Sequence, residues 1–514
     1  MKLWEPGRER LERANLSRFI RFVRGESGDD DLLSYADLHD FSIKHPGKFW
    51  TAVWDFCGIR ASGEREPALV DGDRMPGAKW FPDITLNFAQ NLLRHRDDRT
   101  AIVFRGEAGD ARELSYAELH DEVSKLAAAL RDAGVEAGDR VAAFIPNLPE
   151  AVIAMLAATS LGATWSSCSP DFGIDGVVDR LGQIAPKVLF CADGYAYGGK
   201  RFDSLAKVRG IAERIASIER IVVVPYLDAA PRIEAVPRAT SYAEFIGART
   251  AGPIEFDQKP FGHPLYVLYS SGTTGVPKAI VHGAGGTLIQ HLKELVLHTD
   301  LKREDRIFFY TTCGWMMWNW LVSGLAVGAT VVLYDGSPFE PDGNAMWDLV
   351  DEIGISVFGA SAKYLASLEK AGVKPRETHK LLYLRTVLST GSPLSPESFE
   401  YVYRDIKENV MLSSISGGTD IISCFALGCP VLPVYRGELQ TRGLGMKVEI
   451  LDAHGNAVRE EPGELACTAP FPSMPVGFWN DADGSRYRDA YFSQHPGAWC
   501  QRCLLYTSPS PRDS

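Results

Sequence analysis

The chain has 514 residues, several times the usual size of one domain, so we expect two or more compact units. Hydrophobic residues make up 45% and charged residues 23%, ordinary globular values that exclude wholesale disorder, collagen-like and coiled-coil structure. The net charge of −12 argues against a nucleic-acid partner, which needs a broad basic face. The sequence contains no uncharged apolar run long enough to predict a membrane span, and residues 1–24 lack the apolar core of a signal peptide. We expect a large, soluble, acidic protein.

Nine cysteines are scattered along the chain, which suggests free thiols in a reducing, cytoplasmic environment rather than a disulfide framework. Cys500 and Cys503 form one CxxC pair. Because no second pair or histidine cluster completes a zinc site, a metal at this pair is poorly supported.

Residues 1–95 are rich in Trp, Phe and short helical stretches, and we expect them to form an N-terminal extension against a larger domain. A helix is predicted after Ser115, because Ser115 and Glu118 have capping-box spacing and apolar residues then recur on one face as far as Gly134. A buried strand over 140–146 and a helix over 149–161 follow.

Short Val/Ile-rich strands continue to alternate with helices, and are expected at 187–191, 220–224, 265–269, 307–310, 330–333, 356–358 and 386–388. This alternation predicts an α/β fold with a doubly wound, largely parallel sheet that binds ligands at the carboxyl ends of its strands. Residues 96–442 would form this core and 443–500 a small β-subdomain. Residues 501–514 would be a non-native or disordered tail.

A turn rich in Gly, Ser and Thr, Tyr269–Lys278, directly follows one predicted strand. Gly272 and Gly275 allow unusual backbone angles, and the hydroxyls and amides of the turn can surround phosphate oxygens. Lys278 adds a mobile positive charge. The turn is not a Walker A loop, since Pro277 precedes the lysine and the spacing differs. A flexible turn is the alternative, but this composition after a buried strand favours phosphate binding.

The segment Ser270–Lys278 resembles the phosphate loop of the adenylate-forming superfamily, which includes acyl-CoA synthetases, luciferases and peptide-synthetase adenylation domains. Ser389–Pro393, Ser416–Asp420 and Gly463–Leu465 resemble later family motifs in the same order, and the resemblance extends from about residue 35 to Trp499. It implies that ATP is bound by Ser270, Ser271, Gly272, Thr273, Thr274, Gly275, Lys278, Gly391, Ser392, Pro393 and Thr419.

The same resemblance implies catalytic roles for Thr273, Lys278, Thr419 and Asp420. Thr419 would donate to the α-phosphate, and Asp420 would bind Mg²⁺ through a hard carboxylate oxygen. The family usually has glutamate at this position, so the shorter aspartate changes the distance to the metal. Taken alone, a Thr-Asp pair is also typical of an Asx turn or a helix cap.

Four further segments are most similar to the acetoacetyl-CoA synthetase type, and next to the acetyl-CoA synthetases; they are 79–93, 165–173, 191–200 and 314–319. In acetyl-CoA synthetases, the segment that matches Gly198, Gly199, Lys200 and Arg201 contacts the phosphates of CoA. The resemblance therefore implies a CoA site there, although the spacing alone fits a solvated loop equally well.

The acyl pocket is expected to contain Trp315, Met317, Asn319 and Gly417. Acetyl-specific enzymes have tryptophan where this chain has Gly417, and losing an indole opens on the order of 150–250 Å² of surface for a longer acid. Trp315 would border the carboxylate, with plain core packing as the alternative. Asn319 or a backbone amide would hydrogen-bond the distal ketone of acetoacetate.

Together these resemblances imply a two-step ligase of lipid and ketone-body metabolism, in which acetoacetate attacks the α-phosphorus of ATP and CoA then displaces AMP. Acetate, propionate and other short-chain acids are alternative substrates. The expected partners are small molecules only, and the sequence does not indicate an oligomeric state.

Two other functions stay open. The first is an adenylation module that feeds a carrier protein, against which the 198–201 segment argues. The second is an ATP-binding fragment without turnover. Gln501–Cys503 stands where the family has Gly-Asp, and no mobile domain with a catalytic lysine follows, so we expect the chain to be C-terminally truncated and impaired.

Overall fold

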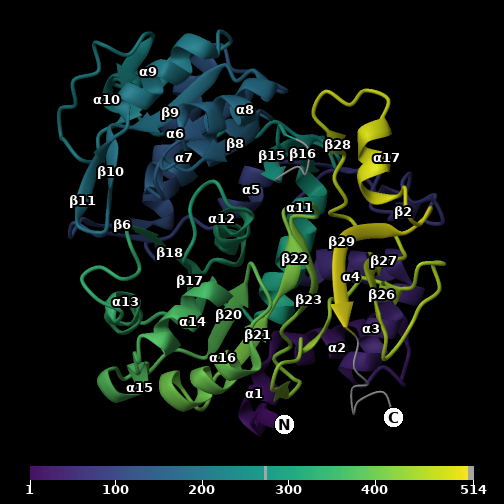
Figure 1. The fold of residues 1–514 in the computed structure, drawn as a ribbon. Helices are drawn as coiled ribbons and strands as arrows, with labels where there is room; N and C mark the ends of the chain where they lie inside the picture. The colour runs from purple at the N-terminus through teal and green to yellow at the C-terminus, as the bar shows by residue number, and fades with distance from the viewer. Residues whose placement is uncertain (271–274, 507–514) are drawn as a thin grey trace.

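The computed structural model describes residues 1–270 and 275–506, with only the main chain for 501–506, and is built around two large sheets (Figure 1). The first sheet has eight strands in the order β13-β12-β9-β7-β8-β15-β16-β28. Its strands run parallel from β13 to β15, whereas β16 and β28 are antiparallel to their neighbours. The strands are β7 (Arg140–Phe144), β8 (Thr164–Cys168), β9 (Val188–Ala192), β12 (Arg220–Val224), β13 (Ala239–Ser241), β15 (Pro264–Ser270), β16 (Lys278–Gly283) and β28 (Gly477–Phe478).

The second sheet has seven strands in the order β21-β20-β19-β17-β18-β5-β6. All neighbouring pairs are parallel except β5 and β6. The strands are β5 (Thr100–Gly106), β6 (Ala111–Ser115), β17 (Arg306–Phe309), β18 (Thr330–Asp335), β19 (Val357–Ser361), β20 (Thr386–Thr390) and β21 (Met411–Ser414). The predicted α/β fold with doubly wound parallel sheets is confirmed.

Helices surround both sheets in Figure 1, with α6–α10 around the first and α13–α16 around the second. Their bounds are α6 (Tyr116–Asp132), α7 (Pro149–Ser160), α8 (Ile174–Ile184), α9 (Leu205–Arg214), α10 (Tyr242–Ile246), α13 (Ala345–Ile353), α14 (Ala362–Lys370), α15 (Pro375–Thr378), α16 (Pro396–Tyr401) and the π-helix η3 (Val402–Ile406). As predicted, α6 begins after a capping box in which Ser115 Oγ accepts from Glu118 N. Within the described residues, no helix combines the length and the apolar character needed to cross a membrane.

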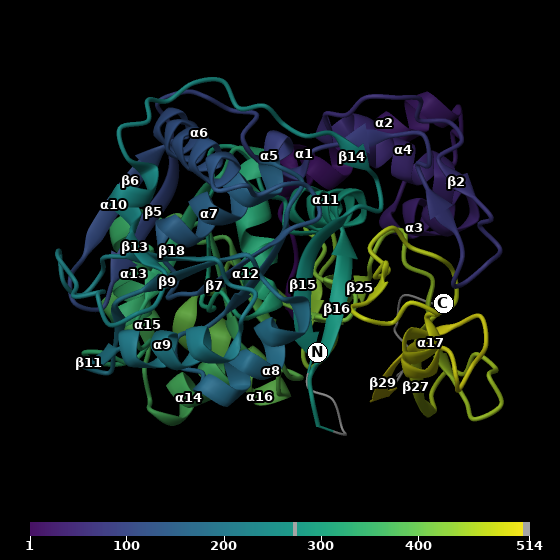
Figure 2. The same cartoon turned by 90° about the horizontal axis from the view of Figure 1, so that it is seen from above.

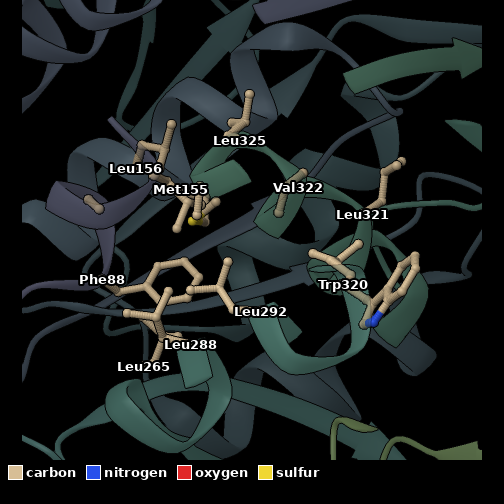
Figure 3. Close-up of a cluster of buried hydrophobic side chains, with 14 of the residues drawn as sticks. Phe88, Met155, Leu156, Leu265, Leu288, Leu292, Trp320, Leu321, Val322 and Leu325 are labelled. Atoms are coloured by element: carbon tan, nitrogen blue, oxygen red, sulfur yellow. The ribbon is translucent and has the colours of Figure 1, made fainter. Parts of the chain in front are cut away.

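The largest hydrophobic core joins side chains from both sheets. Figure 3 shows part of it, where Phe88 of α5 (Phe88–Leu92), Met155 of α7 and Leu292 of α11 (Ala284–Leu292) lie close to α12 (Met316–Val322) and the 3-10 helix η2 (Ser323–Val327). Every residue of α7 except Glu150 is buried. This apolar packing fixes α11 and α12, which lead to the candidate site.

The N-terminal segment forms α1 (Arg8–Arg13), α2 (Asn15–Ser27), α3 (Tyr35–Lys44) and α4 (Pro46–Cys57). The short strands β1 (Lys2–Trp4) and β24 (Val434–Tyr435) pair with each other. Three further short strands, β2 (Leu69–Val70), β3 (Lys79–Trp80) and β4 (Thr85–Leu86), precede α5, and β4 pairs with β14 (Lys259–Pro260). Asn15 fixes α2 to the core, because its side-chain amide donates to Leu301 O at 3.0 Å and its main-chain N–H to Asp300 Oδ1 at 2.7 Å.

A three-stranded antiparallel sheet follows the core, formed by β26 (Val448–Leu451), β27 (Pro462–Cys467) and β29 (Trp499–Tyr506). Strand β29 continues to residue 506, past the boundary that the sequence predicts at residue 500, and pairs with β27. Residues 507–514 of the predicted tail lie outside the described residues. Helix α17 (Ser485–Tyr491) packs with this sheet and lies beside β27 and β29 in Figure 2.

Candidate active site

The predicted phosphate loop joins two antiparallel strands, β15 and β16, in which Ser270 is paired with Lys278. Ser271, Gly272, Thr273 and Thr274 lie outside the described residues. Gly275 has a φ of +118°, which requires glycine, as the sequence predicted. The buried hydroxyl of Ser270 has no hydrogen-bond partner within the described part of the chain, so its capacity to bind a ligand is unused there.

Lys278 and Asp420 form an ion pair at the start of β16. Lys278 Nζ lies 3.2 Å from Asp420 Oδ1, and the Tyr491 hydroxyl of α17 donates to the same oxygen. The Lys278 ammonium also lies 5.1 Å from the centre of the Tyr491 ring. Two predicted site residues are thus brought together, and a third residue that sequence reasoning missed joins them.

Tyr491 is held rigidly in this position. Its ring stacks on Trp499 with centroids 3.8 Å apart. Burial, and then the neighbouring Asp420 carboxylate, raise the pKa of Tyr491 well above its usual value, so the phenol stays protonated and donates. No motif marks Tyr491; its one signal is the density of aromatic residues between Tyr487 and Trp499.

Thr419 and Asp420 lie in a tight turn of residues 419–422 between β22 (Ser416–Gly418) and β23 (Ser423–Leu427), which form a three-stranded antiparallel sheet with β25 (Thr441–Arg442). Ile421 N donates to Gly418 O at 3.3 Å within the turn. The turn places the Asp420 carboxylate against Lys278, so the Thr-Asp pair occupies a hairpin rather than a helix cap.

The predicted adenosine turn lies next to this hairpin. Gly391, Ser392 and Pro393 are exposed and follow β20, and β22 follows the neighbouring parallel strand β21. Gly391 has a φ of +88°, which favours glycine. Thr390 Oγ1 donates to Ile415 O at 3.1 Å and links the two strand ends. Ligands of doubly wound folds bind at such adjacent carboxyl ends.

Gly417, predicted to enlarge the acyl pocket, lies against the backbone of the neighbouring strand. A Cβ placed on Gly417 would lie 2.2 Å from the main-chain oxygen of Ser423 and 2.7 Å from Cys424 Cα. The backbones of β22 and β23 therefore approach so closely at this bulged position that no side chain fits. This close contact explains the glycine, and the expectation that Gly417 enlarges the acyl pocket stays a prediction.

The other predicted acyl-pocket residues lie around the start of α12. Trp315 precedes the helix and is 55% exposed, so it is not a core tryptophan. Met317 and Asn319 are buried. Neither Asn319 Oδ1 nor Nδ2 has a hydrogen-bond partner of normal geometry among the described residues. The Tyr266 hydroxyl is a weak neighbour of this amide, and the remaining hydrogen-bonding capacity of a fully buried amide fits a polar ligand.

The predicted CoA segment forms the tip of a hairpin between β10 (Gly194–Tyr197) and β11 (Lys200–Asp203). Gly198 N and Gly199 N donate to the two carboxylate oxygens of Glu107 at 2.8 and 2.7 Å. Both glycine amides are therefore engaged by Glu107, and the CoA site at this segment stays a prediction. Lys200 is exposed, and the Arg201 guanidinium donates to Leu227 O.

A magnesium ion fits this site only as a partner of phosphates. Among the side chains that the structure describes, no three His, Cys, Asp or Glu residues come together to form a metal cage. Asp420 provides a single carboxylate with 15% of its side chain exposed. Mg²⁺ commonly binds through one or two carboxylates together with substrate phosphates and water, so this donor set fits an ion that enters with ATP.

Comparison with known protein families places the chain among nucleotide-dependent enzymes. Residues 88–474 match the model of the AMP-binding enzyme family, and residues 35–92 match that of the acetyl-coenzyme A synthetase N-terminus. The acetoacetyl-coenzyme A synthetase of Rhizobium meliloti (strain 1021) is 54% identical over 500 residues, which cover 97% of this chain and 76% of that protein. The acetoacetyl-CoA synthetase of Danio rerio is 48% identical, over 97% of this chain and 75% of that protein.

A solved structure gives the same result for the fold. The acetoacetyl-CoA synthetase from Streptomyces lividans superposes with a TM-score of 0.94 at 42% sequence identity, over 99% of this chain and 78% of that one. The chain therefore belongs to the AMP-binding enzyme family and, within it, to the acetoacetyl-CoA synthetases.

Proposed function

We propose that the chain ligates acetoacetate to CoA while converting ATP to AMP and pyrophosphate. The observation that supports this most strongly is the pairing of Lys278, at the end of the phosphate loop, with Asp420 on the β22–β23 turn. Family membership supplies the reaction class, and the site supplies a cation and an acid of the kind that phosphoryl chemistry uses.

In the first step, a carboxylate oxygen of acetoacetate attacks the α-phosphorus of ATP and pyrophosphate leaves. Lys278 would leave its ion pair with Asp420, bind phosphate oxygens and offset their negative charge. Thr419 would donate a hydrogen bond to the α-phosphate. Mg²⁺, held by Asp420 and the phosphates, would add further positive charge. The protein contributes mainly by positioning the two reactants, and no nucleophilic side chain is required.

Selection of the acid is proposed to depend on residues at the start of α12. The amide N–H of buried Asn319 would donate to the distal ketone of acetoacetate, because neither polar atom of this amide makes a hydrogen bond of normal geometry among the described residues, although the Tyr266 hydroxyl lies near. Trp315 would border the carboxylate and Met317 the carbon chain. A site built around a hydrogen bond rejects substrates that lack the matching group more strongly than an apolar pocket does.

In the second step, the CoA thiol attacks the acyl carbonyl and AMP leaves. Lys200 and Arg201 are proposed to contact the CoA phosphates by charge, while Glu107 holds the hairpin through Gly198 and Gly199. Lys200→Ala should raise the KM for CoA by about 10-fold, with little change in the KM for ATP. Equal changes for both substrates would place the CoA site elsewhere.

Isotope exchange between pyrophosphate and ATP tests the first step without CoA, in a version of the chain extended to the full length of its relatives. We expect exchange that depends on acetoacetate and falls by about 10-fold or more in Asn319→Ala, because the ketone loses its partner. Exchange that is equally fast with acetate would instead favour a short-chain acyl-CoA synthetase of different specificity.

A further inference from the structure

The turn that contains Thr419 and Asp420 is held from behind by α11 and the π-helix η1 (Lys293–His298), which continues from it. Figure 1 shows α11 beside β22 and β23. Gln290 Nε2 donates to Ser423 Oγ at 2.8 Å, and His291 Nε2 lies 2.8 Å from Ile422 O. A helix in the core therefore contacts the last residue of the turn and the first residue of β23.

Ile422, the last residue of this turn, has an unusual backbone conformation. Its φ is +48°, in the left-handed region that hairpin turns normally fill with glycine or asparagine. For a β-branched side chain this conformation is a genuine outlier, and it persists only where the surroundings fix it. Ile422 is fully buried, and its carbonyl accepts the hydrogen bond from His291.

The hydrogen bonds of His291 define its tautomer. Because the Ile422 carbonyl only accepts, Nε2 has the proton, and Nδ1 accepts from Ser323 Oγ at 2.8 Å. Burial lowers the pKa of His291 to about 4, so the ring is neutral near pH 7. The single Ser323 hydroxyl proton can serve either His291 Nδ1 or Asn319 O, which lies 3.1 Å from Oγ, and the neutral tautomer directs it to Nδ1. His291 thus links the Asp420 turn to the end of the acyl-pocket helix α12.

Glu294 forms a second link between the same elements. Its carboxylate accepts from Cys424 N at 3.1 Å and Ser423 Oγ at 2.5 Å, both on β23, and from Trp320 Nε1 of α12 at 2.9 Å. Glu294 is fully buried, and its only nearby cation among the described residues is Lys293 Nζ, 3.5 Å away and also buried. Glu294 lies in the π-helix, and π-helical turns often occur at functional sites.

We propose that His291 and Glu294 are positioning residues, which hold the strained turn with Thr419 and Asp420 in its ligand-binding geometry and tie that geometry to helix α12. The proposal rests on the proposed function for the identity of the ligand, MgATP. Neither residue touches the nucleotide in this scheme. The hairpin of residues 198–201 is held separately by Glu107, so CoA binding should not depend on them.

His291→Leu removes both ring hydrogen bonds and fills the same buried space with an apolar side chain of similar size. His298→Leu is the matched control: His298 lies on the same helical run, is equally buried, and donates from Nδ1 to Gly428 O at 2.8 Å, away from the turn. Ser323→Ala is a milder second variant that removes only the partner of Nδ1. Amide hydrogen exchange of residues 419–424 and calorimetric titration with MgATP are measured for all variants and for the unchanged chain.

In His291→Leu we expect amide exchange at 419–424 to become about 10-fold faster, because the turn opens locally, and the Kd for MgATP to rise by about 10-fold. Ser323→Ala should shift both quantities in the same direction by less. His298→Leu should change neither, even where it lowers the unfolding temperature.

Unchanged exchange at 419–424 in His291→Leu, or equal changes in His298→Leu, would overturn the proposal. If His291→Leu does not fold, unchanged exchange in Ser323→Ala overturns it instead. If the protein without any substitution does not bind MgATP, the proposed function is contradicted. The amide exchange at residues 419–424 would still decide whether His291 holds the turn.

Discussion

Lys278 Nζ lies 3.2 Å from Asp420 Oδ1, although 142 residues separate the two in the chain. The contact joins the end of the phosphate loop to the turn between β22 and β23. Both side chains are partly buried, at 30% and 15% exposure, so solvent screens the pair less than at an open surface. Phosphates that enter the site would compete for the lysine and leave the aspartate to a metal ion.

Asp420→Ala should lower the rate of acetoacetate-dependent exchange between pyrophosphate and ATP by about 10²–10³, the size expected for losing one charge-stabilising group. Asp420→Glu is the matched control, because it keeps the carboxylate and restores the residue usual in the superfamily. Normal exchange in the alanine variant would remove Asp420 from the reaction.

Tyr491→Phe removes the hydroxyl that donates to Asp420 and keeps the ring stacked on Trp499. We expect the KM for ATP to rise by about 5-fold, equivalent to about 1 kcal/mol for one hydrogen bond, with little change in the unfolding temperature. Tyr487→Phe, in the same helix, serves as the control. If both variants behave alike in steady-state kinetics, Tyr491 has only a packing role.

Gly417→Ala should destabilise the protein rather than change its substrate preference, because the new Cβ would clash with the backbone of β23. We expect a loss of ~1–3 kcal/mol in the free energy of unfolding, as for other overpacked sites. Gly252→Ala, where a Cβ meets open space, should change it by less than about 0.5 kcal/mol. A stable Gly417→Ala variant with a new preference for acetate would show that this position selects the acid after all.

Four buried histidines should make the fold sensitive to acid; they are His39, His282, His291 and His298. Burial lowers the pKa of His39 and His291 to about 4, that of His282 to about 3, and that of His298 well below its usual value. Their contribution to stability is complete above the unfolded pKa of about 6.5, and is lost as the pH falls through these lowered values.

Each such group changes the free energy of unfolding by about 1.4 kcal/mol per pH unit within this window. Denaturant unfolding at pH 7.5 and pH 5.0 measures the effect, and the midpoint should be clearly lower at pH 5.0. Coincident midpoints would mean that these histidines are not buried in their neutral form.

Local patterns predicted most of the fold and the outline of the site. The capping box of Ser115 and Glu118 marked the start of α6, and the apolar run of β12 was predicted over the residues that form it. These signals are short-range and depend on spacing, so one sequence contains them. The order of the family motifs likewise predicted which loops meet.

Contacts between distant segments could not be predicted in this way. The residues around Gly417 do not show that β23 passes within contact distance. Likewise, the residues around Glu107 do not show that its carboxylate accepts hydrogen bonds from the amides of Gly198 and Gly199. Tyr491 is one aromatic residue among several until the fold places its hydroxyl on Asp420. Such contacts depend on tertiary packing, which the local sequence does not encode.

Competition between acids tests the central claim most directly. A version of the chain extended to the full length of its relatives, of which it covers about three quarters, is incubated with MgATP, CoA and equal concentrations of acetoacetate and acetate, and the two thioesters are quantified by mass spectrometry. The account predicts that acetoacetyl-CoA forms with a kcat/KM about 100-fold or more above that for acetyl-CoA. The reason is that the ketone of acetoacetate accepts a hydrogen bond in the site, whereas acetate has no ketone. Equal or faster formation of acetyl-CoA would contradict it.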